Sequence, residues 1–151
     1  MHAALPLPIH ELNRDALHLL GLRGRKGSTA REAAEVTAGQ LTWRGLEIFR
    51  KRMAQNRPAF AATIDVSERT LARRAEDSAN VDRSIAERAL RIARIVALAA
   101  FVLEDDGDGL AWLGAPQPGL AGKVPMDLVA SEFGAREVEE LLLRIEHGIY
   151  V

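Results

Sequence analysis

The sequence predicts an all-α protein. Apolar residues recur at helical spacing along most of the chain, capping residues and breakers divide it into short segments, and strand-like alternation is nearly absent. With 151 residues, of which 48% are hydrophobic and 27% charged, the chain is long enough for one compact domain or two small ones.

The first part, residues 1–28, is expected to be a flexible N-terminal segment. Ile9, Leu12 and Ala16 fall at helical spacing, but residues 21–28 are rich in glycine and arginine, as in a flexible basic linker. In the next part, residues 29–104, Thr29 opens a possible capping box, Thr42 is placed to cap a second helix, and Asn56 marks another helix start.

The strongest periodic signal, over residues 82–103, predicts the central helix of the core. Its apolar residues step by 4, 3, 4, 3 and 4 positions and are Ile85, Ala89, Ile92, Val96, Ala99 and Leu103. The same stripe is also a possible surface for joining two subunits.

The last part, residues 105–151, is expected to be a C-terminal domain. The indole of Trp112 is expected to be buried against the last helix, Pro125 to open a helix that Gly134 closes, and residues 135–147 to form the last helix. The acidic residues expected to point outward or sideways from that helix are Glu137, Glu139, Glu140 and Glu146.

Charge is distributed unevenly along the chain. Residues 44–100 carry twelve basic and seven acidic side chains, whereas residues 101–151 carry three basic and ten acidic ones. A basic half suits a polyanion and an acidic half suits a basic protein surface, so the pattern suggests two partners. Uneven charge in a helical protein without such partners is the alternative.

The composition disfavours an enzyme, a metal site and a bound cofactor. The chain has no cysteine, no glycine loop of the kind that binds phosphate, and no pair of histidines at ligand spacing among His2, His10, His18 and His147. The uncharged stretch 95–103 is too short to cross a membrane, and residues 1–10 do not resemble a signal peptide, so a cytoplasmic protein without membrane contact is expected.

The stretch 57–77 predicts a helix-turn-helix, in which Asp65 lies in the turn and Ser67 caps the second helix. Arginine pairs bidentately with guanine and also binds phosphate, so Arg69 and Arg73 are candidates for reading bases and Arg74 for a phosphate contact. The alternative is a small amphipathic helix with a solvated arginine face.

The chain ends in the short apolar tail Gly148, Ile149, Tyr150 and Val151, with a terminal carboxylate. Such ends are captured in the pockets of some partner proteins, although an end that simply frays is the alternative.

Three stretches carry a family resemblance: IDVSERTLARR (64–74), RALRIARIVALA (88–99) and WLGAPQPGLAGKVPMDLVASEFGAREVEELLLRIEHGIYV (112–151). Together they resemble the Xre/MbcA/ParS antitoxin family, the antitoxins of RES–Xre toxin–antitoxin pairs. The positions of the C-terminal pattern are Trp112, Leu113, Pro116, Pro118, Leu120, Gly122, Pro125, Gly134, Val138, Leu141, Leu142, Arg144, Ile145 and Gly148.

The resemblance implies an Xre-like helix-turn-helix part over residues 29–104 that represses its own operon, and a toxin-binding part over residues 105–151. It implies that the C-terminal end occludes the NAD-binding cleft of a RES-domain toxin, which depletes NAD. Implied partners are this toxin and operator DNA. A homodimer within a larger complex is expected because helix-turn-helix proteins usually read paired half-sites. The alternatives are a stand-alone transcriptional regulator and a structural partner of a polar or segregation complex without DNA contact. The implied DNA-binding residues are Ser67, Arg69, Thr70, Arg73 and Arg74, and the implied toxin-binding residues are Arg144, His147, Gly148, Ile149, Tyr150 and Val151.

Overall fold

The computed structural model describes residues 9–148, and this part of the chain is helical and contains no strand. The all-α prediction is therefore confirmed. In chain order the elements are α1 (Ile9–Leu19), α2 (Ala30–Gln40), α3 (Trp43–Arg52), α4 (Arg57–Ile64), α5 (Glu68–Arg73), α6 (Arg83–Leu103), α7 (Asp106–Leu113), the 3₁₀ turn η1 (Pro118–Leu120), α8 (Pro125–Leu128) and α9 (Glu132–Glu146).

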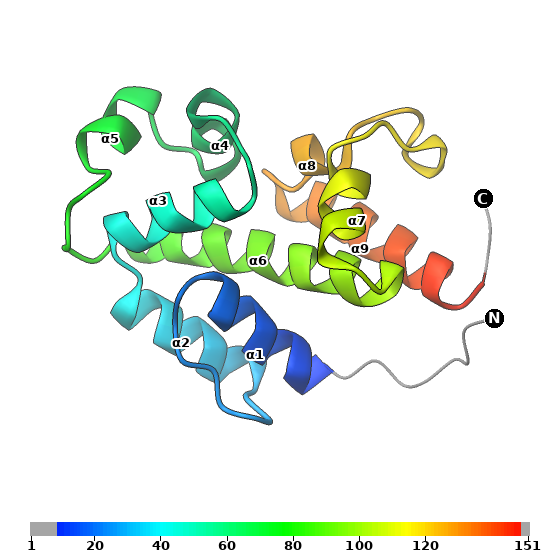
Figure 1. The fold of residues 1–151 in the computed structure, drawn as a ribbon, viewed down its shortest axis with the longest axis horizontal. Helices are drawn as coiled ribbons and strands as arrows, with labels where there is room; N and C mark the ends of the chain where they lie inside the picture. Colours follow the sequence, from blue (N-terminus) through cyan, green and yellow to red (C-terminus); the bar gives the residue numbers. More distant parts are fainter. Residues whose placement is uncertain (1–8, 149–151) are drawn as a thin grey trace.

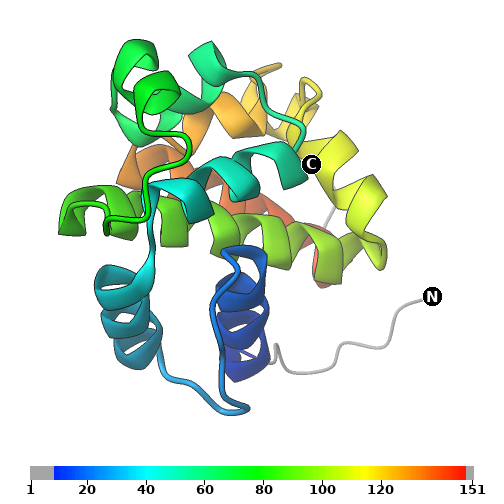
Figure 2. The same ribbon diagram turned by 60° about the vertical axis from the view of Figure 1, so that its left-hand side comes forward.

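Helix α6 runs through the middle of the molecule, as the periodic apolar stripe predicts (Figure 1). Helices α1 and α2 lie side by side below it in both views (Figures 1 and 2), while α7 packs on its C-terminal half and α9 also packs against it. The first five stripe residues are buried, and only Leu103 is partly exposed. The stripe belongs to the core of this chain, so the alternative that it joins two subunits is wrong.

The described part of the predicted flexible segment, residues 9–28, is packed. Leu12, Ala16 and Leu17 of α1 are buried against the core. The following loop is fastened by the buried Asn13, whose Nδ2 donates to the carbonyl of Ser28 at 2.9 Å. The prediction failed because this hydrogen bond joins positions fifteen residues apart, which local composition does not reveal.

The predicted N-caps are present, but the Glu32 carboxylate of the expected capping box accepts from Arg25 Nη2 at 2.9 Å instead of from the Thr29 amide. Thr29 Oγ1 accepts from the Glu32 amide, Thr42 Oγ1 from the Gly45 amide, and Asn56 Oδ1 from the Ala59 amide. Each bond satisfies a helix-terminal N–H that would otherwise have no partner.

The C-terminal part differs from prediction around Gly134. Pro125 does open a helix, but α8 ends at Leu128, and Gly134 lies in the first turn of α9 rather than closing a helix. Its amide donates to Ser131 Oγ at 2.9 Å, and a Cβ atom at this position would lie 2.0 Å from the carbonyl oxygen of Leu128. Glycine is needed here because the two helices approach too closely for any side chain.

Two further predictions in this part need correction. Trp112 packs against the core as expected, but it is only partly buried, whereas the neighbouring Leu113 is completely buried. Glu146 is buried at 4% exposure, although the expected pattern places it outward or sideways. It follows Ile145 at the last turn of α9, where the charge pattern does not reveal which side faces the core.

Candidate functional site

The two helices of the expected helix-turn-helix are α4 and α5, which pack against each other. Asp65 ends α4 with a φ of 56° and so takes the left-handed conformation that favours glycine. Its carboxylate lies 3.7 Å from Arg88 Nη2 on α6, which places a positive charge beside it. The turn is therefore built around an aspartate in a glycine-like conformation.

Apolar contacts fix the first helix of this pair on α3. The rings of Phe49 and Phe60 meet edge to face with centroids 6.1 Å apart, and both side chains are fully buried. Leu71 is the buried residue of α5. The buried side chain of Leu71 and the cap at Ser67 therefore hold this short helix in place, while most of its surface is exposed.

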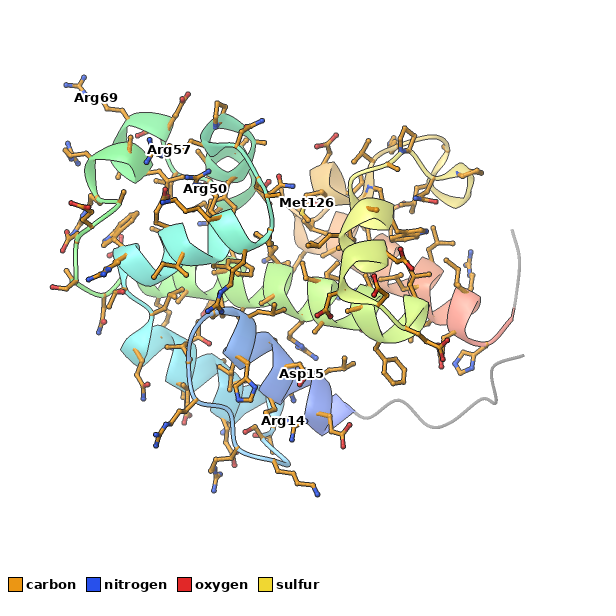
Figure 3. The ribbon with its side chains drawn as sticks, viewed as in Figure 1. Arg14, Asp15, Arg50, Arg57, Arg69 and Met126 are labelled. Carbon is orange, nitrogen blue, oxygen red and sulfur yellow. The ribbon has the colours of Figure 1, made fainter. Side chains whose placement is uncertain are left out.

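The structure exposes the two candidate base-reading arginines. Arg69 and Arg73 are exposed on α5, and Arg69 points away from the body of the molecule in Figure 3. Ser67 and Thr70 use their polar atoms locally. Ser67 Oγ accepts from the Thr70 amide at 3.0 Å and donates to Thr70 Oγ1 at 2.8 Å. These two residues order the start of α5.

Arg74 has partners within the protein. Its guanidinium carbon lies 4.5 Å from the centroid of the Trp43 ring, and its Nε donates to Asp77 Oδ2 at 2.8 Å. The pKa of Asp77 is lowered, first by the hydrogen bond from the Ala79 amide and then by the bond from Arg74. Arg74 thereby ties the end of α5 to the start of α3, which limits its freedom to reach a phosphate.

A buried ion cluster lies beneath this surface and was not found from the sequence. Glu47 on α3 is 4% exposed, and its carboxylate binds Arg50 through both oxygens. Arg57 Nη2 donates to the same carboxylate at 3.2 Å, and Arg50 Nη1 donates to the Gln55 carbonyl at 2.7 Å (Figure 3). The hydrogen bond from Arg50 is the largest cause of the lowered pKa of Glu47. The cluster holds α3, the following loop and α4 together.

The C-terminal residues expected to contact a partner are exposed where the structure describes them. Arg144, His147 and Gly148 are exposed, and Gly148 ends the described chain with a φ of 73°. Ile149, Tyr150 and Val151 lie outside the described residues. The structure therefore brings the three described residues to one end of α9, far along the chain from the exposed arginines of α5.

Residues 9–148 contain no group of three or more side chains positioned to hold a metal ion. Within the same range, no helix is both long enough and apolar enough to cross a membrane.

Comparison with known proteins finds similarity in the C-terminal part. Residues 97–148 match the family model described as the antitoxin Xre/MbcA/ParS C-terminal toxin-binding domain. An "Antitoxin Xre" of Pseudomonas putida is 34% identical over 80 residues, which cover 53% of this chain and 50% of the relative. An "Antitoxin Xre" of Yersinia enterocolitica is 31% identical over 86 residues, which cover 56% of this chain and 58% of the relative. The chain spans about half the length of the curated relatives it matches.

Proposed function

We propose that this chain, whose residues 97–148 match the toxin-binding domain of the Xre/MbcA/ParS antitoxins, belongs to that family. On this proposal it is an antitoxin that binds and neutralises a RES-domain toxin. The match of these residues to a toxin-binding domain carries the proposal. The toxin degrades NAD, and the antitoxin itself has no enzymatic role. Both NAD and operator DNA are found in the cytoplasm, where the protein acts.

We assign the blocking contact to the C-terminal end, residues 144–151. A cleft that binds NAD must hold its pyrophosphate and its rings, and the short apolar segment Ile149, Tyr150 and Val151 is proposed to enter that cleft in place of the nucleotide. Tyr150 then takes the space of a nucleotide ring, and the exposed Arg144 and His147 lie at the edge of the contact.

Removal of residues 148–151 tests this assignment. The truncated antitoxin is expected to leave NAD consumption by the toxin uninhibited, while an equally short deletion of residues 2–5 serves as the control and retains inhibition. Full inhibition by the C-terminally truncated chain would refute occlusion by the tail.

The partner itself is tested by purifying the tagged chain from its source cell. NAD-degrading activity should appear in the co-purified material only after this chain is stripped away. A preparation without such a partner would instead support a stand-alone helix-turn-helix regulator, which the geometry of α4 and α5 favours as the second candidate.

We further propose that the protein represses its own operon as a homodimer, because helix-turn-helix proteins usually read paired half-sites. Replacing the exposed Arg73 by alanine is expected to weaken operator binding by about 1–3 kcal/mol and to reduce its salt dependence, and Arg69→Ala is expected to act in the same direction. Arg31→Ala, on the exposed surface of α2, is the matched control. Equal DNA affinity of all four proteins would show that α5 is only scaffold.

A further inference from the structure

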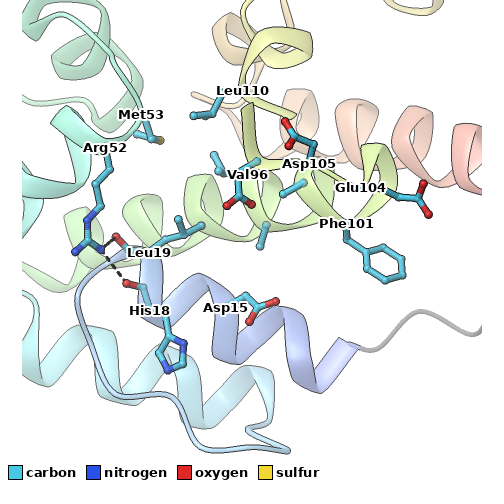
Figure 4. A pocket seen from close by; sticks show the side chains of 13 residues that line it. Asp15, His18, Leu19, Arg52, Met53, Val96, Phe101, Glu104, Asp105 and Leu110 are labelled. Carbon is cyan, nitrogen blue, oxygen red and sulfur yellow. Dashed lines mark hydrogen bonds between the residues drawn. The ribbon is translucent and has the colours of Figure 1, made fainter. Parts of the chain in front are cut away.

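A groove lies where the N-terminal helices meet the C-terminal part (Figure 4). Its volume is about 1000 Å³, and its walls are the ends of α1 and α3, the second half of α6 and the beginning of α7. Apart from Val96, the residues of α6 and α7 that line it fall within residues 97–148, the part that matches the toxin-binding domain.

The floor of the groove is apolar. Leu19, Phe101 and Leu110 are only partly buried there, while Met53 and Val96 are almost completely buried. Partly buried apolar side chains on a concave surface gain free energy when a partner removes them from water. The floor therefore favours an apolar side chain from another protein.

The rim of the groove is acidic. Four carboxylates line it, from Asp15, Glu104, Asp105 and Asp106, against one guanidinium, that of Arg52. The negative end of the α6 helix dipole adds to this charge, because the last turn of α6 contains no basic residue. The rim consequently favours a positively charged partner.

The guanidinium of Arg52 is already held by the protein. Its Nη1 donates to the carbonyls of His18 at 3.0 Å and Leu19 at 3.1 Å, as Figure 4 shows. This contact fixes the end of α1 against α3 and so sets one wall of the groove. Asp15, on α1 in the same wall, has a side chain that is 52% exposed, and its Oδ1 lies 3.7 Å from Arg14 Nε.

We propose that this groove receives a basic amphipathic segment of the toxin, with its apolar side chains on the floor and its lysines or arginines at the rim. The inference rests on the proposed function and adds a second contact region to the C-terminal end. Because α1 and α3 form one side of the groove, the bound segment touches both the helix-turn-helix part and the toxin-binding part of the antitoxin.

The test compares the affinity of antitoxin variants for the toxin identified by co-purification, in a catalytically inactive form. The rim variant is Asp15→Lys/Asp106→Lys. Its control is Glu35→Lys/Glu76→Lys, which changes the charge equally at exposed positions outside the groove. Calorimetric titration at physiological salt is expected to give about tenfold weaker binding or more for the rim variant, and unchanged binding for the control.

A floor variant separates local contact from long-range charge effects. Phe101→Ala removes apolar surface without changing charge and is expected to weaken toxin binding several-fold. The helicity and melting temperature of each variant are measured beside the affinity, so that weaker binding by a folded protein is distinguished from unfolding.

Several outcomes would overturn the inference. If wild type binds the toxin and the rim variant binds it equally well, the groove is not a toxin contact, although the proposed function stands. If the rim variant loses only self-association of the antitoxin, a second copy of this chain occupies the groove instead. If wild type does not bind the toxin at all, the proposed function fails and this inference fails with it.

Discussion

Replacing Glu47 by alanine is expected to destabilise the protein by about 3–5 kcal/mol, because it leaves a buried arginine without its partner. The side chains of Glu47 and Arg50 are 5% and 12% exposed. Each hydrogen bond between charged groups contributes about 1.5–3 kcal/mol, so the two bonds to Arg50 amount to about 3–6 kcal/mol before desolvation offsets part of it. Arg57 adds less, since its side chain is 41% exposed and solvent screens the interaction.

The assay is urea unfolding followed by circular dichroism, with a thermal melt as a second measurement. For a chain of this size the expected loss corresponds to a fall in melting temperature of about 10 °C. The control is the double variant Glu47→Leu/Arg50→Met, in which both charges are removed together. It should cost much less than Glu47→Ala, because no uncompensated charge remains buried.

The ion pair of Glu47 and Arg50 also predicts that the stability of the protein depends on pH. The pKa of Glu47 is lowered in the folded state, chiefly by the hydrogen bond from Arg50, so the unfolded state binds a proton at higher pH than the folded state does. The stability contributed by this carboxylate is therefore complete above its unfolded pKa and is lost as pH falls through its folded pKa. Wild type should lose more stability over this range than the double variant. Parallel curves for the two proteins, or a cost of Glu47→Ala below about 1 kcal/mol, would refute this account of the cluster.

Two pairs of substitutions test the packing of the C-terminal part. Gly134→Ala should lower the melting temperature much more than Gly119→Ala does. The new Cβ at residue 134 would lie 2.0 Å from the Leu128 carbonyl oxygen, whereas the Cβ at residue 119 would meet the flexible end of the Leu141 side chain. Equal melting temperatures of the two variants would contradict the close approach at Gly134. Leu113→Ala should cost about 2–5 kcal/mol in urea unfolding, since Leu113 is fully buried, and Trp112→Ala should cost less because the indole is only partly buried. The reverse order would show that the indole, not Leu113, is the anchor.

Local sequence predicted the helices and their starts well. Thr29, Thr42, Asn56 and Ser67 each accept a hydrogen bond from the amide three residues later, so the information needed to place these caps lies within one helical turn. The apolar stripe of α6 was predictable for the same reason, because helical periodicity is a property of neighbouring residues.

The contacts that the sequence did not reveal join distant residues. Asn13 binds the loop at Ser28, and Arg74 stacks on Trp43 instead of remaining a free phosphate ligand. Arg57 also reaches Glu47 across the α3–α4 loop. In each case only the tertiary arrangement supplies the partner of the polar side chain.

The two candidate sites differ in the same respect: one follows from a local sequence pattern and the other does not. The exposed arginines of α5 follow from a short local pattern, since the cap and the turn place them. The groove between α1, α3, α6 and α7 combines residues from four elements, and no local pattern shows that Asp15 and Asp106 line the same groove.

The packing of α6 predicts that the two parts of the chain fold as one unit, although the expected domain boundary at residue 104 falls immediately after it. The five consecutive residues from Ile95 to Ala99 are all buried, which covers the whole circumference of the helix. Helix α1 packs on α6 from the N-terminal part, and α7 crosses it so closely that a Cβ on Gly109 would lie 2.8 Å from the Ala100 nitrogen. Removing α7 to α9 would expose this apolar surface to water.

A chain ending at residue 104 is therefore expected to lose most of its helical signal in far-ultraviolet circular dichroism. The full chain is expected to unfold in a single transition, with the same midpoint by circular dichroism and by tryptophan fluorescence. The two tryptophans make this test sensitive, because Trp43 reports on α3 and Trp112 on α7. Two separate transitions, or a fully helical fragment 1–104, would show that α6 is stable without its C-terminal partners. A single transition would mean that α7, where the toxin is proposed to bind, and α5 belong to one cooperative folding unit, because α6 contacts both parts of the molecule.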